Sequence, residues 1–402
     1  MPTDTNKDRG PRSSLPALRT EFMMQTAQLV APCLFGLERY VKEEIYDLGY
    51  EIDEVMDGRV LFTGDLEAIA RANLHLRCAE RVMLLLARFP ARTFEELYQG
   101  VKAVNWPDYA AREDAVIVTG SSVRSTLSSV PACQRITKKA IADRLCAAYG
   151  LTRLPETGVR LPVQFFLLRD EAMLLLDTSG VPLHKRGYRA EGNLAPIRET
   201  LAAALVHQSH YRGQEVFADP FCGSGTIAIE AAMRARRMAP GLRRSFAFES
   251  FGFLPPVLLR DAREEALEEI IPCELPILAS DIDPAMADLT AKNARLAGVE
   301  SCLRIRTMPI SEFHPEASRG TLICNPPYGE RMSERLACEE LYREMGRVFS
   351  RLRGWSAYVI TSHEEFEGFF GRKANKRRKL YNGMIRCDLY QYYAPRLRRS
   401  DA

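Results

Sequence analysis

The stretch Val216-Phe217-Ala218-Asp219-Pro220-Phe221-Cys222-Gly223-Ser224-Gly225-Thr226 decides the fold of this chain. It reads as an apolar strand, a turn with two glycines and a helix over residues 227–238. Gly223 and Gly225 let the backbone approach a ligand closely. Asp219 offers an acceptor at the carboxyl end of the strand, where open α/β sheets bind their ligands. The stretch therefore predicts a doubly wound α/β domain with a ligand site at this turn.

The carboxylate beside the turn narrows the kind of ligand. A glycine turn can cradle phosphates, but this one has no G-x-x-x-x-G-K-[ST] pattern and no third glycine at the Rossmann spacing. A carboxylate repels pyrophosphate and attracts the ammonium group of an amino acid. We therefore favour S-adenosylmethionine as the ligand over a nucleoside phosphate.

A second apolar strand, over residues 275–280, ends in Asp281-Ile282-Asp283-Pro284. Acidic residues at this place in a nucleotide-binding half typically accept hydrogen bonds from ribose hydroxyls. The distance from the glycine turn exceeds the usual spacing of about 20 residues because residues 240–273 intervene. This insertion carries four phenylalanines and a charged helical pattern over residues 258–270. We expect it to pack beside the ligand pocket and to cover apolar surface.

A third strand, over residues 321–324, leads into Asn325-Pro326-Pro327-Tyr328. The two prolines fix the backbone and remove two donors, so the carbonyls of Asn325 and Pro326 stay free to accept from an amino group. Tyr328 can stack on the base that carries this group. Asn-Pro-Pro alone is most often a simple proline turn, but together with the two upstream strand ends it indicates recognition of a planar exocyclic amine.

This order of glycine turn, acidic strand end and Asn-Pro-Pro-Tyr resembles the class I S-adenosylmethionine-dependent methyltransferases that act on exocyclic amines. Further stretches are similar to the THUMP-domain RNA methyltransferases, in particular the 23S ribosomal RNA guanine-N2 methyltransferase L family and its shorter relatives with one methyltransferase domain. They are Asp219–Thr226, Asn325-Pro326-Pro327-Tyr328-Gly329-Glu330-Arg331, His184-Lys185-Arg186-Gly187-Tyr188-Arg189, Ala195-Pro196-Ile197-Arg198-Glu199-Thr200 and Lys379-Leu380-Tyr381-Asn382-Gly383. The resemblance spans about residues 28–395.

The resemblance implies a set of site residues. Cofactor-binding residues would be Asp219, Phe221, Gly223, Ser224, Gly225 and Thr226 on the methionine side, Asp281 and Asp283 at the ribose, and Ile282 against the adenine. Catalytic residues would be Asn325, Pro326, Pro327 and Tyr328. One departure concerns Met308-Pro309-Ile310, where such enzymes usually carry an acidic residue that contacts the adenine amine. Backbone groups could replace that contact.

The distribution of charge points to nucleic acid more than the total does. The 402-residue chain has a formal net charge of only +3, so it has no global basic field. Positive charge is concentrated in residues 372–379. For this run we favour contact with RNA phosphates over plain solvated surface. The predicted RNA-binding residues are Arg372, Lys373, Lys376, Arg377, Arg378 and Lys379.

Cysteine usage and hydropathy limit other classes of function. Ten cysteines contain no C-x-x-C pair, which argues against a structural zinc site, and His207 and His210 show no third ligand in the sequence. Cys222 and Cys324 flank the expected pocket, but a covalent cysteine mechanism does not need the Asn-Pro-Pro-Tyr stretch. The sequence has no signal peptide and no apolar run of about 18 residues, so we expect no membrane contact and a cytoplasmic protein.

The chain divides into modules by pattern. Residues 1–27 are expected to be a disordered tail and residues 396–402 a basic tail. Alternating strands and helices suggest a ferredoxin-like unit over residues 28–75 and, by resemblance, a THUMP RNA-binding module over 76–184. Residues 185–395 would form the Rossmann-like methyltransferase domain.

The resemblance implies methyl transfer to N2 of a guanosine in 23S ribosomal RNA, free or within a pre-50S particle. Transfer RNA is the alternative substrate, since the same modules serve both. DNA adenine methylation uses a related motif, and the RNA-type front half argues against it. A different class is an RNA-binding assembly factor whose catalytic site has decayed. The sequence leaves the oligomeric state and the target nucleotide open.

Overall fold

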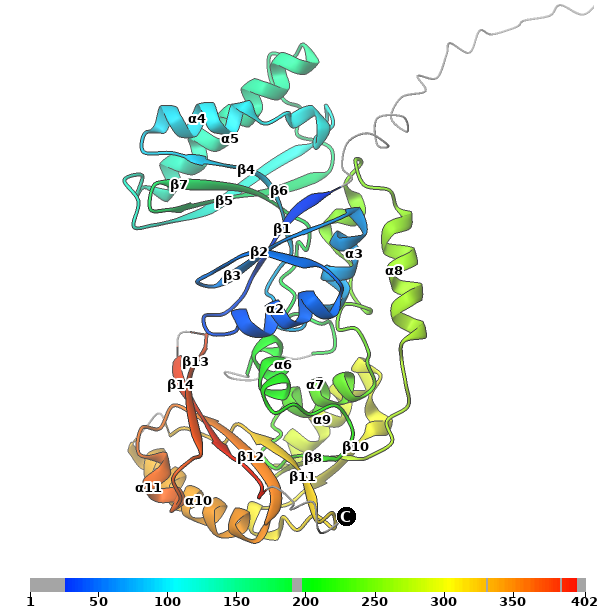
Figure 1. Ribbon diagram of the computed structural model, residues 1–402, viewed down its shortest axis with the longest axis vertical. Helices are drawn as coiled ribbons and strands as arrows, with labels where there is room; N and C mark the ends of the chain where they lie inside the picture. The colour runs from blue at the N-terminus through cyan, green and yellow to red at the C-terminus, as the bar shows by residue number, and fades with distance from the viewer. Residues whose placement is uncertain (1–25, 190–196, 330–331, 384, 396–402) are drawn as a thin grey trace, which may run out of the picture.

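The computed structural model describes residues 26–189, 197–329, 332–383 and 385–395. The expected tails, apart from residues 26 and 27, and the motif residues at 195–196 and 330–331 lie outside these ranges. The described chain forms two seven-stranded sheets, one in each half (Figure 1).

The first sheet joins the two N-terminal modules into one structure. Its strand order is β2-β3-β1-β4-β7-β6-β5. The strands are β1 Ala27–Pro32, β2 Glu51–Met56, β3 Arg59–Gly64, β4 Met83–Pro90, β5 Ala115–Val123, β6 Arg160–Leu168 and β7 Glu171–Asp177. The helices are α2 Glu38–Asp47, α3 Leu66–His75, α4 Phe94–Ala103 and α5 Val130–Tyr149. Because β4 pairs with both β1 and β7, the ferredoxin-like and THUMP modules share a continuous ladder.

Helix starts in this half follow local capping chemistry. Asp65 caps α3 by accepting from the backbone of Ala68, and Thr93 and Glu96 form a reciprocal capping box at the start of α4. Strand β2 has no clear signal in the sequence, since half of its residues are exposed and its charged stretch lacks an apolar run. It forms the outer edge of the sheet.

The second sheet has the order β10-β9-β8-β11-β12-β14-β13, with parallel pairing except around β14. Its strands are β8 Val216–Asp219, β9 Ile277–Asp281, β10 Leu303–Thr307, β11 Arg319–Cys324, β12 Gly354–Thr361, β13 Lys376–Asn382 and β14 Ile385–Tyr392. The helices of this half are α6 Glu199–Gln208, α7 Thr226–Ala235, α8 Val257–Glu268, α9 Pro284–Ala297, α10 Met332–Arg351 and α11 Phe366–Phe370. Strand β8 lies between β9 and β11, so the chain reverses its direction of winding there. This is the doubly wound fold that the glycine stretch predicts.

The insertion corrects one expectation. Residues 240–273 do not pack beside the pocket: α8 lies along α3 of the N-terminal half, as Figure 1 shows. The backbone N–H of Phe248 donates to the carbonyl of Thr178, just after β7, at 3.0 Å. The aromatic cluster thus covers apolar surface, as expected, but at the junction of the two halves.

No helix within the described ranges is long and apolar enough to cross a membrane.

Candidate active site

The predicted site residues meet at one edge of the second sheet. Strands β8, β9 and β11 are neighbours and run parallel, so their carboxyl ends lie together. Asp219 ends β8, Asp281 ends β9, and Asn325 follows β11. This is the topological switch point at which open α/β sheets bind ligands.

The glycine turn is shaped by helix α9. Gly225 has φ of +83°, and a Cβ there would lie 2.8 Å from the Thr290 side chain. Thr290 Oγ1 donates to the carbonyl of Gly223 at 2.8 Å, and Asn293 Nδ2 donates to that of Ser224 at 2.9 Å. These contacts hold the backbone of the turn against α9, so a ligand would bind at the face of the turn away from α9.

Asp219 is a buried carboxyl group with one free oxygen. Its Oδ1 accepts from the backbone N–H of Phe221 at 3.2 Å, while Oδ2 has no hydrogen-bond partner within the described residues. Burial, with a smaller contribution from the Asp281 charge, raises the pKa of Asp219 to about 8. An unpartnered buried acceptor is costly, and an ammonium group would satisfy it. The free Oδ2 of Asp219 therefore fits the ammonium group at the amino-acid end of S-adenosylmethionine.

The two aspartates after β9, Asp281 and Asp283, make different contacts. Asp281 accepts from the backbone N–H groups of Gly223 and Asp283, both at 3.0 Å, so it ties the glycine turn to the second strand. A carboxylate has further lone pairs beyond these two bonds, with which it can accept from a ligand hydroxyl. Asp283 instead caps α9, with Oδ1 accepting from Ala285 at 2.9 Å. Ile282 is 72% exposed, as an apolar surface against a ligand ring would be.

The Asn-Pro-Pro-Tyr stretch follows β11 as predicted, but its tyrosine is turned inward. Pro326 is buried and Pro327 exposed. The Tyr328 hydroxyl donates to Asn325 Oδ1, and Cys387 Sγ lies 3.8 Å from the same hydroxyl. Burial raises the pKa of the Tyr328 phenol far above its usual value. The acceptor expected to hold a target amine is therefore occupied by Tyr328 in this structure.

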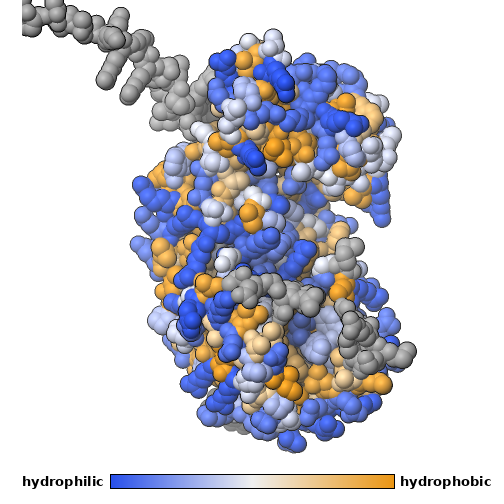
Figure 2. Space-filling model, turned by 180° about the vertical axis from the view of Figure 1, so that it is seen from behind, coloured by the Kyte–Doolittle hydropathy of each residue, from blue (hydrophilic) through white to orange (hydrophobic). Residues whose placement is uncertain are grey.

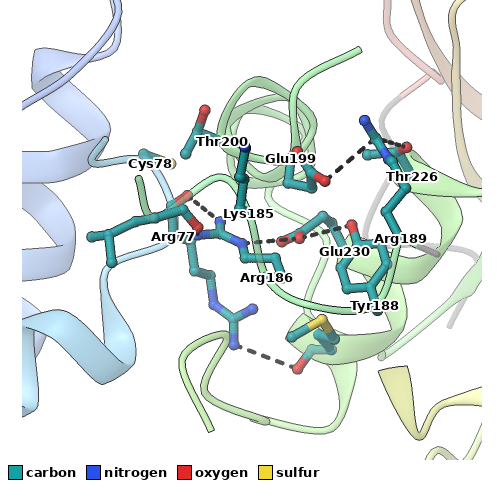
Figure 3. A network of polar contacts seen from close by, with 12 residues as sticks. Arg77, Cys78, Lys185, Arg186, Tyr188, Arg189, Glu199, Thr200, Thr226 and Glu230 are labelled. Carbon is teal, nitrogen blue, oxygen red and sulfur yellow. Dashed lines mark hydrogen bonds and ion pairs between the residues drawn. The ribbon is translucent and has the colours of Figure 1, made fainter. Parts of the chain in front are cut away.

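Two supporting residues were not predicted from the sequence. The hydroxyl of Tyr342, a fully buried residue of α10, donates to the carbonyl of Pro327 at 2.7 Å and lies 3.4 Å from Thr361 Oγ1. This hydrogen bond holds the Asn-Pro-Pro-Tyr loop against α10. Arg189 donates to Thr226 Oγ1 at 2.7 Å and to the carbonyl of Ile197 at 3.1 Å, at the start of α7 (Figure 3). The one signal in the sequence that points to Tyr342 is the spacing of apolar residues along its helix, which indicates that its side chain faces the core.

The cysteines near the site are poor nucleophiles. Cys222 and Cys324 are buried, and burial raises the pKa of both thiols well above the usual range. Because the thiolate is the reactive form, this geometry disfavours a covalent cysteine mechanism.

The basic run forms the edge strand β13 and the turn before it. Arg372, Lys373, Lys376 and Lys379 are exposed. Arg377 pairs with Asp388 at 2.7 Å. Arg378 differs from the rest, because its guanidinium donates to Tyr40 and Gly36 of the N-terminal half and to Gln208 of α6. Its donors are used within the protein, so we remove Arg378 from the predicted RNA surface.

Family models match each part of the chain. The "RMKL-like, methyltransferase domain" matches residues 186–391, the "RlmL ferredoxin-like domain" residues 28–83 and the "THUMP domain" residues 91–177. The first match covers more than half of the chain.

Whole proteins are similar over most of this chain. "Putative RNA methyltransferase YpsC" of Bacillus subtilis is 45% identical over 92% of this chain and 97% of its own length. "Ribosomal RNA large subunit methyltransferase K/L" of Methylococcus capsulatus is 34% identical over 92% of this chain. The present chain spans 52% of that relative, about half its length.

A solved structure carries the cofactor product. SMU.472, crystallised in complex with SAH, is 42% identical and superposes with a TM-score of 0.88 over 94% of this chain and 100% of its own. Together with the free oxygen of Asp219, this identifies S-adenosylmethionine as the cofactor. The chain belongs to the RlmK/L family of S-adenosylmethionine-dependent RNA methyltransferases, with ferredoxin-like, THUMP and methyltransferase domains.

Proposed function

We propose that the protein methylates N2 of a guanosine in 23S ribosomal RNA. The observation that carries the proposal is the meeting of Asp219, Asp281 and Asn325 at one switch point, with Asn-Pro-Pro-Tyr beside the cofactor turn. The large-subunit RNA named for the K/L relatives supports the substrate. The base and its N2 position follow from the resemblance of the sequence motifs.

The site supplies alignment more than acid or base chemistry. When bound, S-adenosylmethionine provides an electrophilic methyl group on a sulfonium. Asn325 Oδ1 and the carbonyl of Pro326 would accept from the guanine amine and hold its lone pair in line, which is worth about 7–11 kcal/mol of a barrier in well-oriented reactions. The same acceptors would stabilise the positive charge that develops on the amine.

Tyr328 has to leave Asn325 before an amine can bind there. Its hydroxyl and the target amine compete for the same carboxamide oxygen. We expect Tyr328 to swing out on binding and stack on the guanine ring, as the sequence motif predicts. The cofactor-binding and catalytic assignments, from Asp219 to Tyr328, are part of this proposal.

The RNA would lie along the side of the molecule that carries β13. Figure 2 shows a hollow at the right of the outline, below the upper lobe of the molecule. This lobe holds α4 and α5, and because Figure 2 is seen from behind, its right side is the left side of Figure 1. Strand β13 borders the same side in Figure 1. Arg372, Lys373, Lys376 and Lys379 are exposed on β13 and the turn before it and would contact phosphates, with Arg377 held by Asp388. A cytoplasmic location remains part of the prediction.

The test offers unmodified 23S RNA, 16S RNA, bulk transfer RNA and DNA separately to the purified protein with tritiated S-adenosylmethionine, followed by nucleoside identification. We expect N2-methylguanosine in 23S RNA. The same nucleoside in transfer RNA would move the substrate to transfer RNA, and N6-methyladenosine would overturn the base. Cofactor binding without label in any of the four would call for pre-50S particles as substrate. Neither binding nor label would leave the assembly-factor function.

A further inference from the structure

Three metal-ligating side chains meet at the junction of the two halves, away from the methyltransferase site. Glu44 comes from α2, Cys78 from the loop after α3, and His207 from α6. Glu44 is 8% exposed, Cys78 0% and His207 6%. One ligand atom of each lies within 4.8 Å of the other two. Figure 3 shows Cys78 on the ribbon of the N-terminal half, facing the methyltransferase domain.

Two atoms of this cluster, Glu44 Oε1 and His207 Nδ1, have no hydrogen-bond partner among the described residues. Glu44 Oε2 accepts from the backbone N–H groups of Arg77 and Cys78, both at 3.0 Å, which fixes the carboxylate. Its other oxygen, Oε1, faces His207 Nδ1 at 3.8 Å. Within the described part of the chain, neither atom has a hydrogen-bond partner. Two buried acceptors aimed at each other are unfavourable unless a proton or a metal ion lies between them.

The outer nitrogen of His207 has the partner that metal-bound histidines usually have. Its Nε2 lies 3.2 Å from Glu43 Oε2, so the proton of a neutral ring belongs there. This leaves the Nδ1 lone pair pointed at Glu44. A carboxylate that orients the far nitrogen of an imidazole is the common outer-shell arrangement of a metal site.

We propose that Glu44, Cys78 and His207 bind one Zn²⁺ ion that joins the N-terminal modules to the methyltransferase domain. Thiolate, imidazole and carboxylate are the ligand types that zinc selects. Binding releases the Cys78 thiol proton to solvent, and the thiolate and carboxylate then balance the two positive charges of the ion. Zinc–ligand bonds of about 2.0–2.3 Å place tetrahedral ligand atoms roughly 3.3–3.8 Å apart, so the three side chains would draw together by about 1 Å. A water completes the coordination.

The proposal does not depend on the methylation reaction. The ion would hold α2 against α6, and α6 lies directly before β8 in the chain. It thus links the RNA-binding half to the cofactor half by a bond that neither half can make alone.

The experiment titrates chelator-treated full-length protein with Co²⁺ and follows thiolate-to-metal absorption, then displaces the ion with Zn²⁺ and measures zinc content by mass spectrometry. We expect one ion per chain. Cys78→Ser should abolish the thiolate band, and His207→Gln should lower Zn²⁺ affinity by 10²-fold or more. Cys133→Ser and His210→Gln are matched controls, one buried cysteine and one nearby histidine outside the cluster, and should bind as the parent protein does.

A graded variant separates a metal site from a simple polar cluster. Glu43→Gln removes the carboxylate beside His207, together with an exposed ion pair to Arg39, and should weaken zinc binding by about 10–100-fold, as removal of an outer-shell partner does. Folded parent protein that gives no thiolate band and takes up no zinc would overturn the proposal and leave the cluster as a polar contact between α2 and α6. A band that survives Cys78→Ser would overturn it as well.

Discussion

Asp219 shows the conflict between stability and function at the scale of one residue. The sequence placed it at the end of a strand, and the structure adds that it is buried with a free oxygen. Because burial raises its pKa from 3.8 to about 8, the folded state holds a proton that the unfolded chain loses. This group therefore lowers stability progressively as pH rises from about 4 to about 8, and not below that window.

We predict that Asp219→Asn is more stable than the parent protein but binds the cofactor much more weakly. The amide removes the ionisable group, so the gain in free energy of unfolding should be larger at pH 8 than at pH 5. Removal of the charge facing the ammonium should weaken S-adenosylmethionine binding by 10²-fold or more, since removing one partner of a buried charge pair costs about 2–5 kcal/mol. Urea unfolding at both pH values and calorimetry check this. Unchanged affinity, or a gain independent of pH, would contradict it.

Tyr342 is the residue whose role the sequence could not give. Its partner, Pro327, is 15 positions away in the chain, and only the packing of α10 under the loop brings them together. By contrast, Asp219, Asp281 and Asn325 could be predicted because each follows directly from its own strand. Contacts within a motif are visible in the sequence, whereas contacts between elements depend on how the elements pack.

We predict that Tyr342→Phe lowers the turnover number by about 2- to 10-fold, the equivalent of one hydrogen bond of about 0.5–1.5 kcal/mol. The KM for S-adenosylmethionine should stay unchanged, because Tyr342 braces the amine-binding loop and not the cofactor turn. Tyr390→Phe is the control, since the buried Tyr390 hydroxyl has no hydrogen-bond partner among the described residues. Equal kinetics for the two variants would remove the positioning role.

At the scale of elements, β13 carries two functions on one strand. Side chains of a strand alternate between its faces, so Lys376 and Arg378 share one face of β13 and Lys379 lies on the other. Arg378 binds the N-terminal half, while Lys376 and Lys379 remain exposed. The sequence predicts the positive run but not this division, because it does not say which residues of the strand another element covers.

We predict that Lys376→Gln with Lys379→Gln weakens RNA binding and flattens its salt dependence by roughly 0.7–0.9 for each phosphate that the protein no longer neutralises. Arg378→Gln should leave this slope unchanged and lower the unfolding temperature. Binding measured at several salt concentrations, with thermal unfolding of each variant, checks both. A slope that falls for Arg378→Gln alone would reverse the assignment.

The sequence also could not show which element the insertion at residues 240–273 packs against. Its helix was predicted at nearly the observed place, residues 258–270 against Val257–Glu268. Its partner was wrong, because an amphipathic helix shows that it has an apolar face and not what covers that face.

At the scale of the whole molecule, a buried polar network joins the two halves. Arg186 pairs with Glu230 of α7 at 3.3 Å and donates to the carbonyl of Arg77, while Arg77 donates to the carbonyl of Met238 at 2.6 Å (Figure 3). The Arg186 and Glu230 side chains are 2% and 0% exposed. The family motif around Arg186 thus has a structural role in holding the N-terminal half against the methyltransferase half.

We predict that Arg186→Ala destabilises the protein by about 3–5 kcal/mol, because it leaves Glu230 charged and buried without its partner. Arg186→Met with Glu230→Gln should recover part of this stability by removing both charges. Chemical unfolding of the three proteins gives the comparison. A single variant as stable as the parent protein would show that the network contributes little.

The central claim is that Asn325 receives the target amine beside a separate cofactor pocket, and Asn325→Ala tests it most directly. The measurement is the single-turnover rate of methyl transfer to 23S RNA at saturating S-adenosylmethionine. We predict a fall of about 10²-fold or more, as for removal of a preorganised polar group at the reacting atoms, with the dissociation constant of the cofactor unchanged. An unchanged rate would contradict the claim and remove Asn-Pro-Pro-Tyr from the chemistry.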